Sequence, residues 1–138
     1  MLPNLDLERR IQALERNMRE IRGDRGATEP ATWTPTWTGL TVVGSPTYTG
    51  RYTRTGNIVK WQAVIVAGGA ITTQSVAGIT FINNLPFISA AGDTLTAADA
   101  TNVLGIGIGF INGGTDDAYT PAWGPTNDTI VISGWYEI

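Results

Sequence analysis

The chain has 138 residues and a formal net charge of −3, a length that suits one domain with a short appendage. It contains no cysteine and no histidine, which excludes disulfides, zinc–thiolate sites, cysteine nucleophiles and a Ser-His-Asp triad built within the chain. Nine Lys and Arg stand against 12 Asp and Glu, so the composition does not favour nucleic acid as a partner. No apolar run is long enough to cross a membrane. Together these features argue against most classes of enzyme, and we expect neither a cofactor nor an enzymatic activity.

The charged residues are concentrated at the start of the chain. Residues 1–30 hold six Arg and six Asp or Glu, whereas all 12 aromatic residues come later. The composition changes across residues 23–35, where two glycines and two prolines argue against a helix. We therefore expect three parts, a helix at 1–22, an extended linker at 23–35 and a β domain at 36–138.

The first 22 residues carry the apolar repeat of a coiled coil. Their apolar positions alternate spacings of four and three, which is the a/d seam: Leu7, Ile11, Leu14, Met18 and Ile21. A helix of this length is marginal alone in water and has an apolar stripe to bury. Two arrangements would bury the stripe, namely packing on the chain's own β domain or self-association.

Arg10 and Glu15 favour self-association. Residues 10–15, Arg-Ile-Gln-Ala-Leu-Glu, resemble the short signature Arg-h-x-x-h-Glu of parallel three-stranded coiled coils, where h is apolar. The Arg10 stem would cover the seam while its guanidinium pairs with Glu15 of a neighbouring helix. We expect a parallel homotrimer, with this helix as its trimerisation and docking element.

From Trp37 onward the sequence is typical of an antiparallel β domain, because Thr, Val, Ile and Gly dominate it. Turn signals recur at a sandwich-like spacing, so we expect seven or eight strands in a jelly-roll-like β-sandwich. The clearest element is a hairpin of strands 46–54 and 58–66 whose buried face carries Val59, Trp61, Ala63 and Ile65. Further strands are expected at 37–43, 76–82, 85–88, 103–111 and 128–138, and a loop or short helical turn at 89–100.

Residues 104–110 alternate large apolar residues with glycine. This spacing is not the Gly-x-Gly-x-x-Gly of a dinucleotide site, and no helix is expected to follow it. One face of such a strand is bare backbone, which allows another group to approach closely. Two occupants fit that bare face, a tryptophan of the same domain or a neighbouring subunit.

No catalytic residue and no metal site can be assigned, because no two acids stand out as a pair that would flank a glycosidic bond. Asp116 and Asp117 follow a glycine-rich stretch and are interpreted as a solvated loop, with a calcium site as the alternative.

The best candidates for ligand binding lie in a predicted loop at 112–127. Aromatic rings there could pack on sugar C–H groups while amides and carboxylates bond the hydroxyls. The alternative for Trp123 is a plug at the end of the sandwich. The candidate residues are Asp116, Asp117, Tyr119, Trp123 and Asn127.

Three segments resemble bacteriophage tail and fibre proteins. Residues 33–40, Trp-Thr-Pro-Thr-Trp-Thr-Gly-Leu, are similar to the Trp-x-Pro-x entry that precedes their C-terminal β domains. Residues 49–59 resemble their recurring Gly-x-Tyr-x-Arg-x-Gly-x-x-Val hairpin, and residues 132–138 resemble their closing strand. The order of these motifs after a trimer-type helix strengthens the resemblance, whereas residues 67–128 match nothing recognisable.

The resemblance implies a homotrimeric fibre or spike protein on the tail or capsid surface of a virion. Its N-terminal region would contact other virion proteins, and its β head would bind a glycan or protein of the host cell surface. The first alternative is a purely structural fibre or head-decoration protein without receptor activity. A second alternative is a β-sandwich depolymerase that acts on surface polysaccharide.

Overall fold

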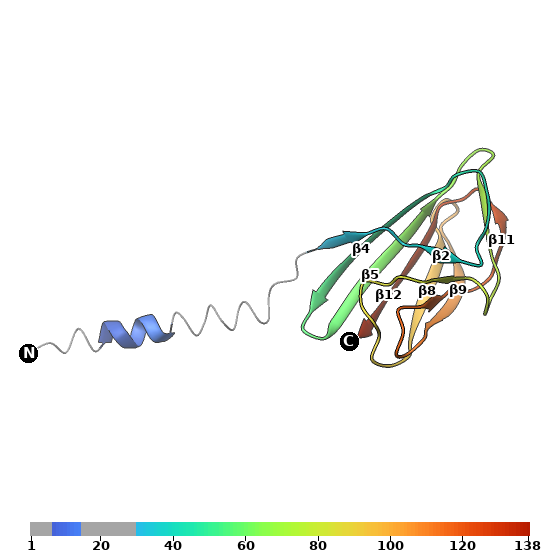
Figure 1. Cartoon of the computed structure of the whole chain (residues 1–138). Helices are drawn as coiled ribbons and strands as arrows, with labels where there is room; N and C mark the ends of the chain where they lie inside the picture. The colour runs from blue at the N-terminus through green and yellow to red at the C-terminus, as the bar shows by residue number, and fades with distance from the viewer. Residues whose placement is uncertain (1–6, 15–29) are drawn as a thin grey trace, which may run out of the picture.

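The computed structural model of the chain describes residues 7–14 and 30–138 (Figure 1). In this described part the strands form a nine-stranded sheet of order β1-β4-β5-β12-β8-β9-β10-β7-β2 and a three-stranded sheet of order β11-β6-β3. All strand pairings within both sheets are antiparallel, which confirms the predicted antiparallel, mainly β fold. The strands are β1 (Ala31–Trp33), β2 (Trp37–Thr38), β3 (Thr41–Val43), β4 (Thr47–Thr55), β5 (Ile58–Val66), β6 (Thr72–Ser75), β7 (Phe81–Ile82), β8 (Asp93–Asp99), β9 (Leu104–Ile111), β10 (Ala118–Tyr119), β11 (Trp123–Thr126) and β12 (Ile130–Glu137).

The two longest strands, β4 and β5, form the predicted hairpin, and β12 lies on the other side of β5 (Figure 1). The hairpin turns at Gly56, whose φ of 61° lies in the left-handed region that glycine tolerates. Side chains alternate between the two faces of a strand, so the four residues predicted to face the core are buried. Lys60 and Gln62 point to the opposite side, which we call the outer face of the large sheet.

The core lies on the inner face of the large sheet. It includes Val59 and Ile65 of β5, Leu95 of β8, and Ile132 and Tyr136 of β12. These strands are adjacent in the sheet, so their inward side chains form one continuous apolar layer.

Trp123 of β11 ties the small sheet to this core. Its side chain is only 7% exposed and meets the ring of Trp37 edge-on, with 6.5 Å between ring centroids. Its indole Nε1–H donates a hydrogen bond of 3.3 Å to Oγ1 of Thr73 on β6. Trp123 is therefore a packing residue between the two sheets.

The strand β8 was not predicted, because residues 89–100 were expected to be a loop or helical turn. In fact β8 lies near the middle of the large sheet, between β12 and β9. Leu95 and Ala97 point into the core, and Thr94 and Thr96 face outward. Pairing on both edges stabilises this strand although its sequence has few branched apolar residues.

Three predicted strands were wrong in extent. Residues 76–80 form a turn in which the backbone N–H of Val76 donates to Oγ1 of Thr80 at 2.8 Å, so only β7 remains of the strand expected at 76–82. Residues 85–88 are not a strand. The strand expected at 37–43 is divided between the two sheets as β2 and β3, because Gly39 adopts a φ of 73° between them.

The strand β1 lies inside the stretch that was expected to be a linker. Its three residues pair with β4, with Trp33 opposite Gly50, so the large sheet begins at residue 31. The prediction of an irregular connection through residue 35 was therefore wrong at its C-terminal end. Residues 23–29 of the predicted linker lie outside the described residues.

Residues 7–14 are helical, as predicted. The side chains of Leu7, Ile11 and Leu14 are exposed by 58%, 47% and 62%, so these three residues of the apolar stripe are not buried on the β domain. The other seam residues, together with Glu15, lie outside the described residues, and the coiled coil itself is not shown. No described helix has the length and apolar character needed to cross a membrane.

Candidate functional site on the outer face of the sheet

The structure does not gather the five predicted ligand-binding residues into one site. Asp116 and Asp117 lie beside the end of β9 at Ile111, because the backbone N–H of Asn112 donates to the carbonyl of Asp117 at 3.0 Å. Asn127 lies near Gly69, to whose carbonyl its side-chain amide donates at 3.1 Å. The carboxylate of its neighbour Asp128 accepts a hydrogen bond from Asn102, which lies in the turn before β9, at the opposite end of that strand. Trp123 is buried between the two sheets, so these residues do not lie together as one aromatic and polar patch.

Hydrogen bonds of the backbone hold the Asp116–Asp117 pair in place. Leu85 donates its N–H to the carbonyl of Asp116 at 3.0 Å, and Asp117 donates its own to Oγ1 of Thr115 at 3.1 Å. Burial, together with repulsion from Asp116, raises the pKa of Asp117 above its ordinary value. No described cluster of three acidic residues forms around the pair.

A second pair of acids is joined by one amide. The side-chain nitrogen of Asn102 donates to Oδ2 of Asp99 at 3.0 Å and to Oδ2 of Asp128 at 2.8 Å. The hydrogen bond from the Asn102 amide lowers the pKa of Asp99, and the backbone N–H groups of Thr101 and Asn102 contribute further. This arrangement fastens the turn between β8 and β9 to the start of β12, which is a structural role.

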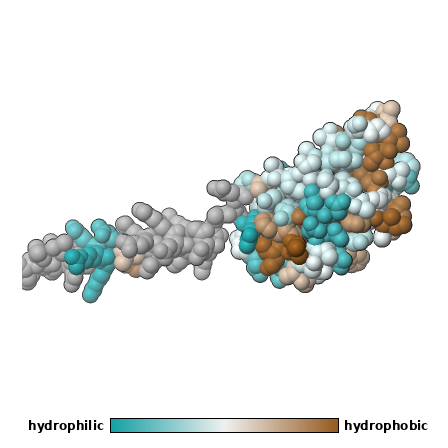
Figure 2. Space-filling model, viewed as in Figure 1, coloured by the Kyte–Doolittle hydropathy of each residue, from teal (hydrophilic) through white to brown (hydrophobic). Residues whose placement is uncertain are grey.

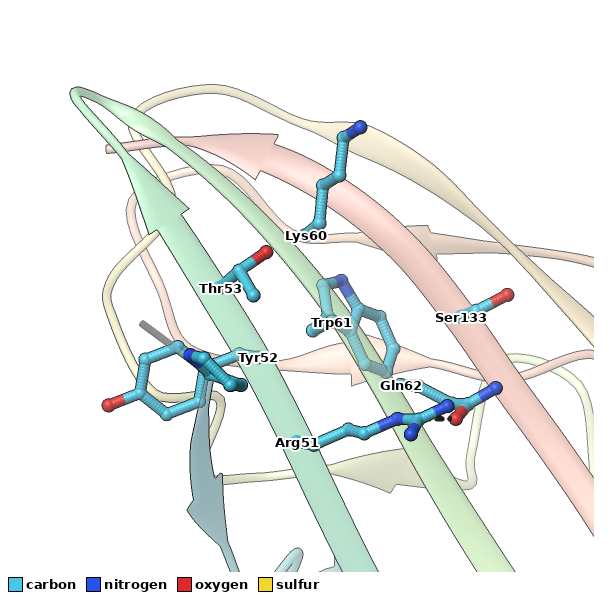
Figure 3. A pocket seen from close by; sticks show the side chains of 8 residues that line it. Arg51, Tyr52, Thr53, Lys60, Trp61, Gln62 and Ser133 are labelled. Carbon is cyan, nitrogen blue, oxygen red and sulfur yellow. Dashed lines mark hydrogen bonds between the residues drawn. The ribbon is translucent and has the colours of Figure 1, made fainter. Parts of the chain in front are cut away.

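The hollow drawn in Figure 3 lies on the outer face of β4, β5 and β12. It has a volume of about 310 Å³, and its outward-pointing lining residues are Arg51, Thr53, Lys60, Gln62 and Ser133. Nε–H of Arg51 donates to Oε1 of Gln62 at 3.0 Å, so the guanidinium is held above the sheet. A second hollow of about 360 Å³ lies on the other side of this pair, beside Thr49 and Val64.

Trp135 stands beside this hollow. The register pairs Lys60 with Trp135 on one side and with Thr53 on the other, so these three residues form one outward row across β4, β5 and β12. The neighbouring row consists of Arg51, Gln62 and Ser133. Trp135 is 51% exposed, which is unusual for the largest aromatic side chain in a sheet.

The cations of the β domain all belong to the hairpin of β4 and β5. Among residues 31–138 they are Arg51, Arg54 and Lys60. The guanidinium carbon of Arg54 lies 5.1 Å from the centre of the Phe87 ring, and its Nε–H donates to the carbonyl of Gly56 at 2.9 Å. Arg51 and Lys60 differ from it, because both are on the outer face and their strand partners are uncharged.

Gly107 and Gly109 of β9 face other segments of the chain, whereas a Cβ at Gly105 would meet nothing within 4 Å. A Cβ at Gly107 would lie 3.1 Å from Cβ of Pro121, and one at Gly109 would lie 2.8 Å from Cδ1 of Leu95 and overlap the Tyr119 carbonyl. Pro121, Leu95 and Tyr119 fill the space beside Gly107 and Gly109, so the tryptophan expected there is not the occupant. Contact of this strand with a neighbouring subunit stays a prediction.

Two large side chains of β9 point outward, whereas Ile111 is buried in the core. Ile108 and Phe110 are each 64% exposed. Phe110 pairs with Tyr119, whose ring centre lies 4.7 Å from that of Phe81 on the next strand. We call Phe81, Ile108, Phe110 and Tyr119 the apolar row. Apolar surface occurs in several separate patches between polar regions on the face seen in Figure 2.

Comparisons with known proteins identify no relative: no family model, curated protein or solved structure matches the chain.

Proposed function

We propose that the chain is a homotrimeric fibre or spike protein of a virion, whose β domain binds a glycan or protein on the host cell surface. The observation that carries this proposal is the outer face of β4, β5 and β12. Arg51, Lys60 and Trp135 lie there in two adjacent rows, outside the core and beside an open hollow. A rigid sheet that presents cationic, aromatic and hydroxyl groups together is suited to recognition.

The trimeric part of the proposal is supported by the N-terminal helix. Its described residues expose Leu7, Ile11 and Leu14, and the spacing continues through Met18 and Ile21. Burial of such a seam between parallel helices stabilises a coiled coil, and Arg10 with Glu15 favours three strands. The same region would contact other virion proteins.

The apolar row gives the β domains a second means of contact with each other. The outward residues of β8 that flank it, Thr94 and Thr96, are uncharged. Contact between two such faces would therefore bury apolar area without removing a charge from water. An exposed apolar face of this kind marks an interaction surface more often than a free one.

Parts of the segments that resemble phage fibre proteins are neighbours in the sheet. Residues 33–40 include Trp33 of β1, which pairs with Gly50 of the second segment, 49–59. The third segment, 132–138, lies in β12, which pairs with β5. Parts of the three motifs thus meet on β1, β4, β5 and β12, whereas Trp37 and Thr38 of the first motif form β2 at the opposite edge of the sheet.

The alternative is a purely structural fibre or head-decoration protein. The apolar row favours it, because such a surface would also suit permanent contact with other virion proteins. Neither reading includes a catalytic step.

A glycan array together with light scattering tests the proposal on the full chain. We expect a trimer that binds at least one class of bacterial surface glycan or, failing that, intact host cells through a surface protein. A trimer that binds neither glycans nor cells would favour the structural alternative. A monomer would contradict both.

A further inference from the structure

We propose that the outer face of β4, β5 and β12 binds an acidic polysaccharide, one that carries carboxylates on its sugar units. A sugar ring would pack on Trp135, and carboxylates would bind Arg51 and Lys60. This inference rests on the proposed attachment function and names the class of its ligand and the residues that bind it.

The distribution of charge carries the first step. Five of the six acids in residues 31–138 lie at the ends of the β8, β9, β10 and β12 strands or in the turns between them: Asp93, Asp99, Asp116, Asp117 and Asp128. The sixth, Glu137, is two residues beyond Trp135 on the same face and bounds the site at that end. A chain that is acidic as a whole therefore presents two cations together on one face, which favours an anionic ligand there.

The second step is the geometry of Arg51. Its Nε–H is already bonded to Gln62, so the two terminal nitrogens of the guanidinium remain to bind a ligand. These two groups form a fork that matches a carboxylate with two parallel hydrogen bonds. Because Gln62 fixes the side chain before binding, less conformational freedom is lost when the ligand arrives.

The third step is Trp135. Its ring is half exposed and lies next to Lys60 in the register. An indole face packs on the C–H groups of a sugar, and this contact does not require a charged ligand. The hydroxyls of Thr53 and Ser133 and the amide of Gln62, which all line the hollow, can bond sugar hydroxyls.

The shape of the face favours a polymer. Three adjacent strands span about 10 Å across the sheet, and two residues along a strand span about 7 Å. The two hollows follow each other on either side of the Arg51–Gln62 pair rather than forming one closed cavity. A chain of sugars could pass over both.

Single-stranded nucleic acid also combines negative charge with rings that stack. The face offers one exposed tryptophan rather than a series of aromatic platforms, and the chain carries a net charge of −3. These features favour the polysaccharide, and an oligothymidylate serves as the competing probe.

The test uses the full chain with a panel of carboxylated bacterial capsular polysaccharides and the same polymers after their carboxyl groups have been reduced to alcohols. Binding is measured by calorimetry in low and in physiological salt. We expect binding to at least one acidic polymer, weaker binding in higher salt, and loss of binding after reduction.

Three variants test the residues, and one is a matched control. Arg51→Gln, Lys60→Gln and Trp135→Ala should each weaken binding by about tenfold or more, the amount expected when a charge-assisted hydrogen bond or a stacking contact is lost. Arg54→Gln removes a cation from the same hairpin that packs on Phe87, so it should leave affinity unchanged. Thermal unfolding checks that all four variants fold.

The outcomes separate the inference from the proposed function. The inference would be overturned if the reduced polymers bind as tightly as the carboxylated ones, or if Arg54→Gln lowers the affinity as much as Arg51→Gln does. Either result would leave the attachment function standing. Tighter binding of oligothymidylate than of any polysaccharide would replace it with a nucleic-acid site. If no polysaccharide in either form and no host cell is bound, both the inference and the attachment function fail.

Discussion

The indole of Trp33 lies directly over Gly50. A Cβ added at position 50 would come within 2.6 Å of Cε3 of Trp33, although the backbone of Gly50 is not in the left-handed region. Glycine is therefore needed there for space and not for its conformation. Trp33 then meets Tyr52 and Trp61 edge-on, at 6.1 and 6.3 Å between ring centroids, which joins β1 to the core.

The first prediction concerns this contact. Gly50→Ala should destabilise the domain by about 1–3 kcal/mol, since the indole or the β1 strand must move. Combined with Trp33→Ala, the same change should cost much less, because the clash is gone. Urea unfolding measures both. Gly124→Ala is the control, because a Cβ there would meet nothing within 4 Å. If Gly124→Ala lowers the free energy of unfolding as much as Gly50→Ala does, the contact with Trp33 is not the cause.

The second prediction concerns Val103, which has a φ of 56° and is 87% exposed. A β-branched side chain is unfavourable in this left-handed conformation, whereas asparagine tolerates it. Val103→Asn should raise the free energy of unfolding by about 1 kcal/mol. Val103→Ala should gain less, because alanine has no preference for that conformation. A lower thermal midpoint for the asparagine variant would show that the turn is not strained.

The third prediction concerns alkaline unfolding. Burial raises the pKa of Tyr136 to about 12 from an ordinary 10.0, so the folded state holds the phenol proton after the unfolded chain has released it. The contribution of Tyr136 to stability is then complete below pH 10 and is lost as the pH rises from 10 to 12.

Tyr136→Phe should remove that loss of stability at alkaline pH. At neutral pH it should cost about 1 kcal/mol, because the N–H of Phe87, which donates to the Tyr136 hydroxyl at 3.1 Å, loses its acceptor. Denaturant unfolding at several pH values measures both effects. The control is Tyr119→Phe on the outer face. If the stability of the two variants depends on pH in the same way, Tyr136 does not cause the loss of stability at alkaline pH.

The fourth prediction concerns the apolar row. If the β domains of a trimer touch through it, Phe110→Thr and Ile108→Thr should lower the thermal midpoint of the trimer, because apolar area is no longer buried between copies. In a chain with a broken helical seam the same changes should have little effect, since both side chains are 64% exposed in the single chain. Ile79→Thr, at a residue 60% exposed outside the row, is the control. If Phe110→Thr, Ile108→Thr and Ile79→Thr lower the thermal midpoint of the trimer equally, the β domains do not touch through the apolar row.

Much of the large sheet could be predicted from local patterns. The bounds of β5 agree with the prediction because a Gly-Asn turn precedes the strand and the polar residues Lys60 and Gln62 alternate with apolar ones within it. The strand β8 was missed because its residues are mostly Ala, Thr and Asp, and its position depends on pairing with β9 and β12, which are formed by distant segments. Leu95 and Ala97 were the only local signal of its inward face.

The candidate site was only partly visible in the sequence. Alternation placed Lys60 and Gln62 outward, and Trp135 is out of phase with the buried Ile132 and Tyr136, which was a readable sign of exposure. The burial of Trp123 was less readable, because it arises from contacts with Thr73 and Trp37 on strands far away in the sequence. Local polarity alone therefore favoured a segment whose tryptophan is buried in the fold.

The molar mass of the full chain in solution, measured by light scattering, tests the central claim most directly. The account predicts three times the 14.7 kDa of one chain. It also predicts that Ile11→Asn with Leu14→Asn, which puts unpaired amides into the seam, lowers this mass or makes it depend on concentration. A wild-type mass of one chain at all concentrations would contradict the account.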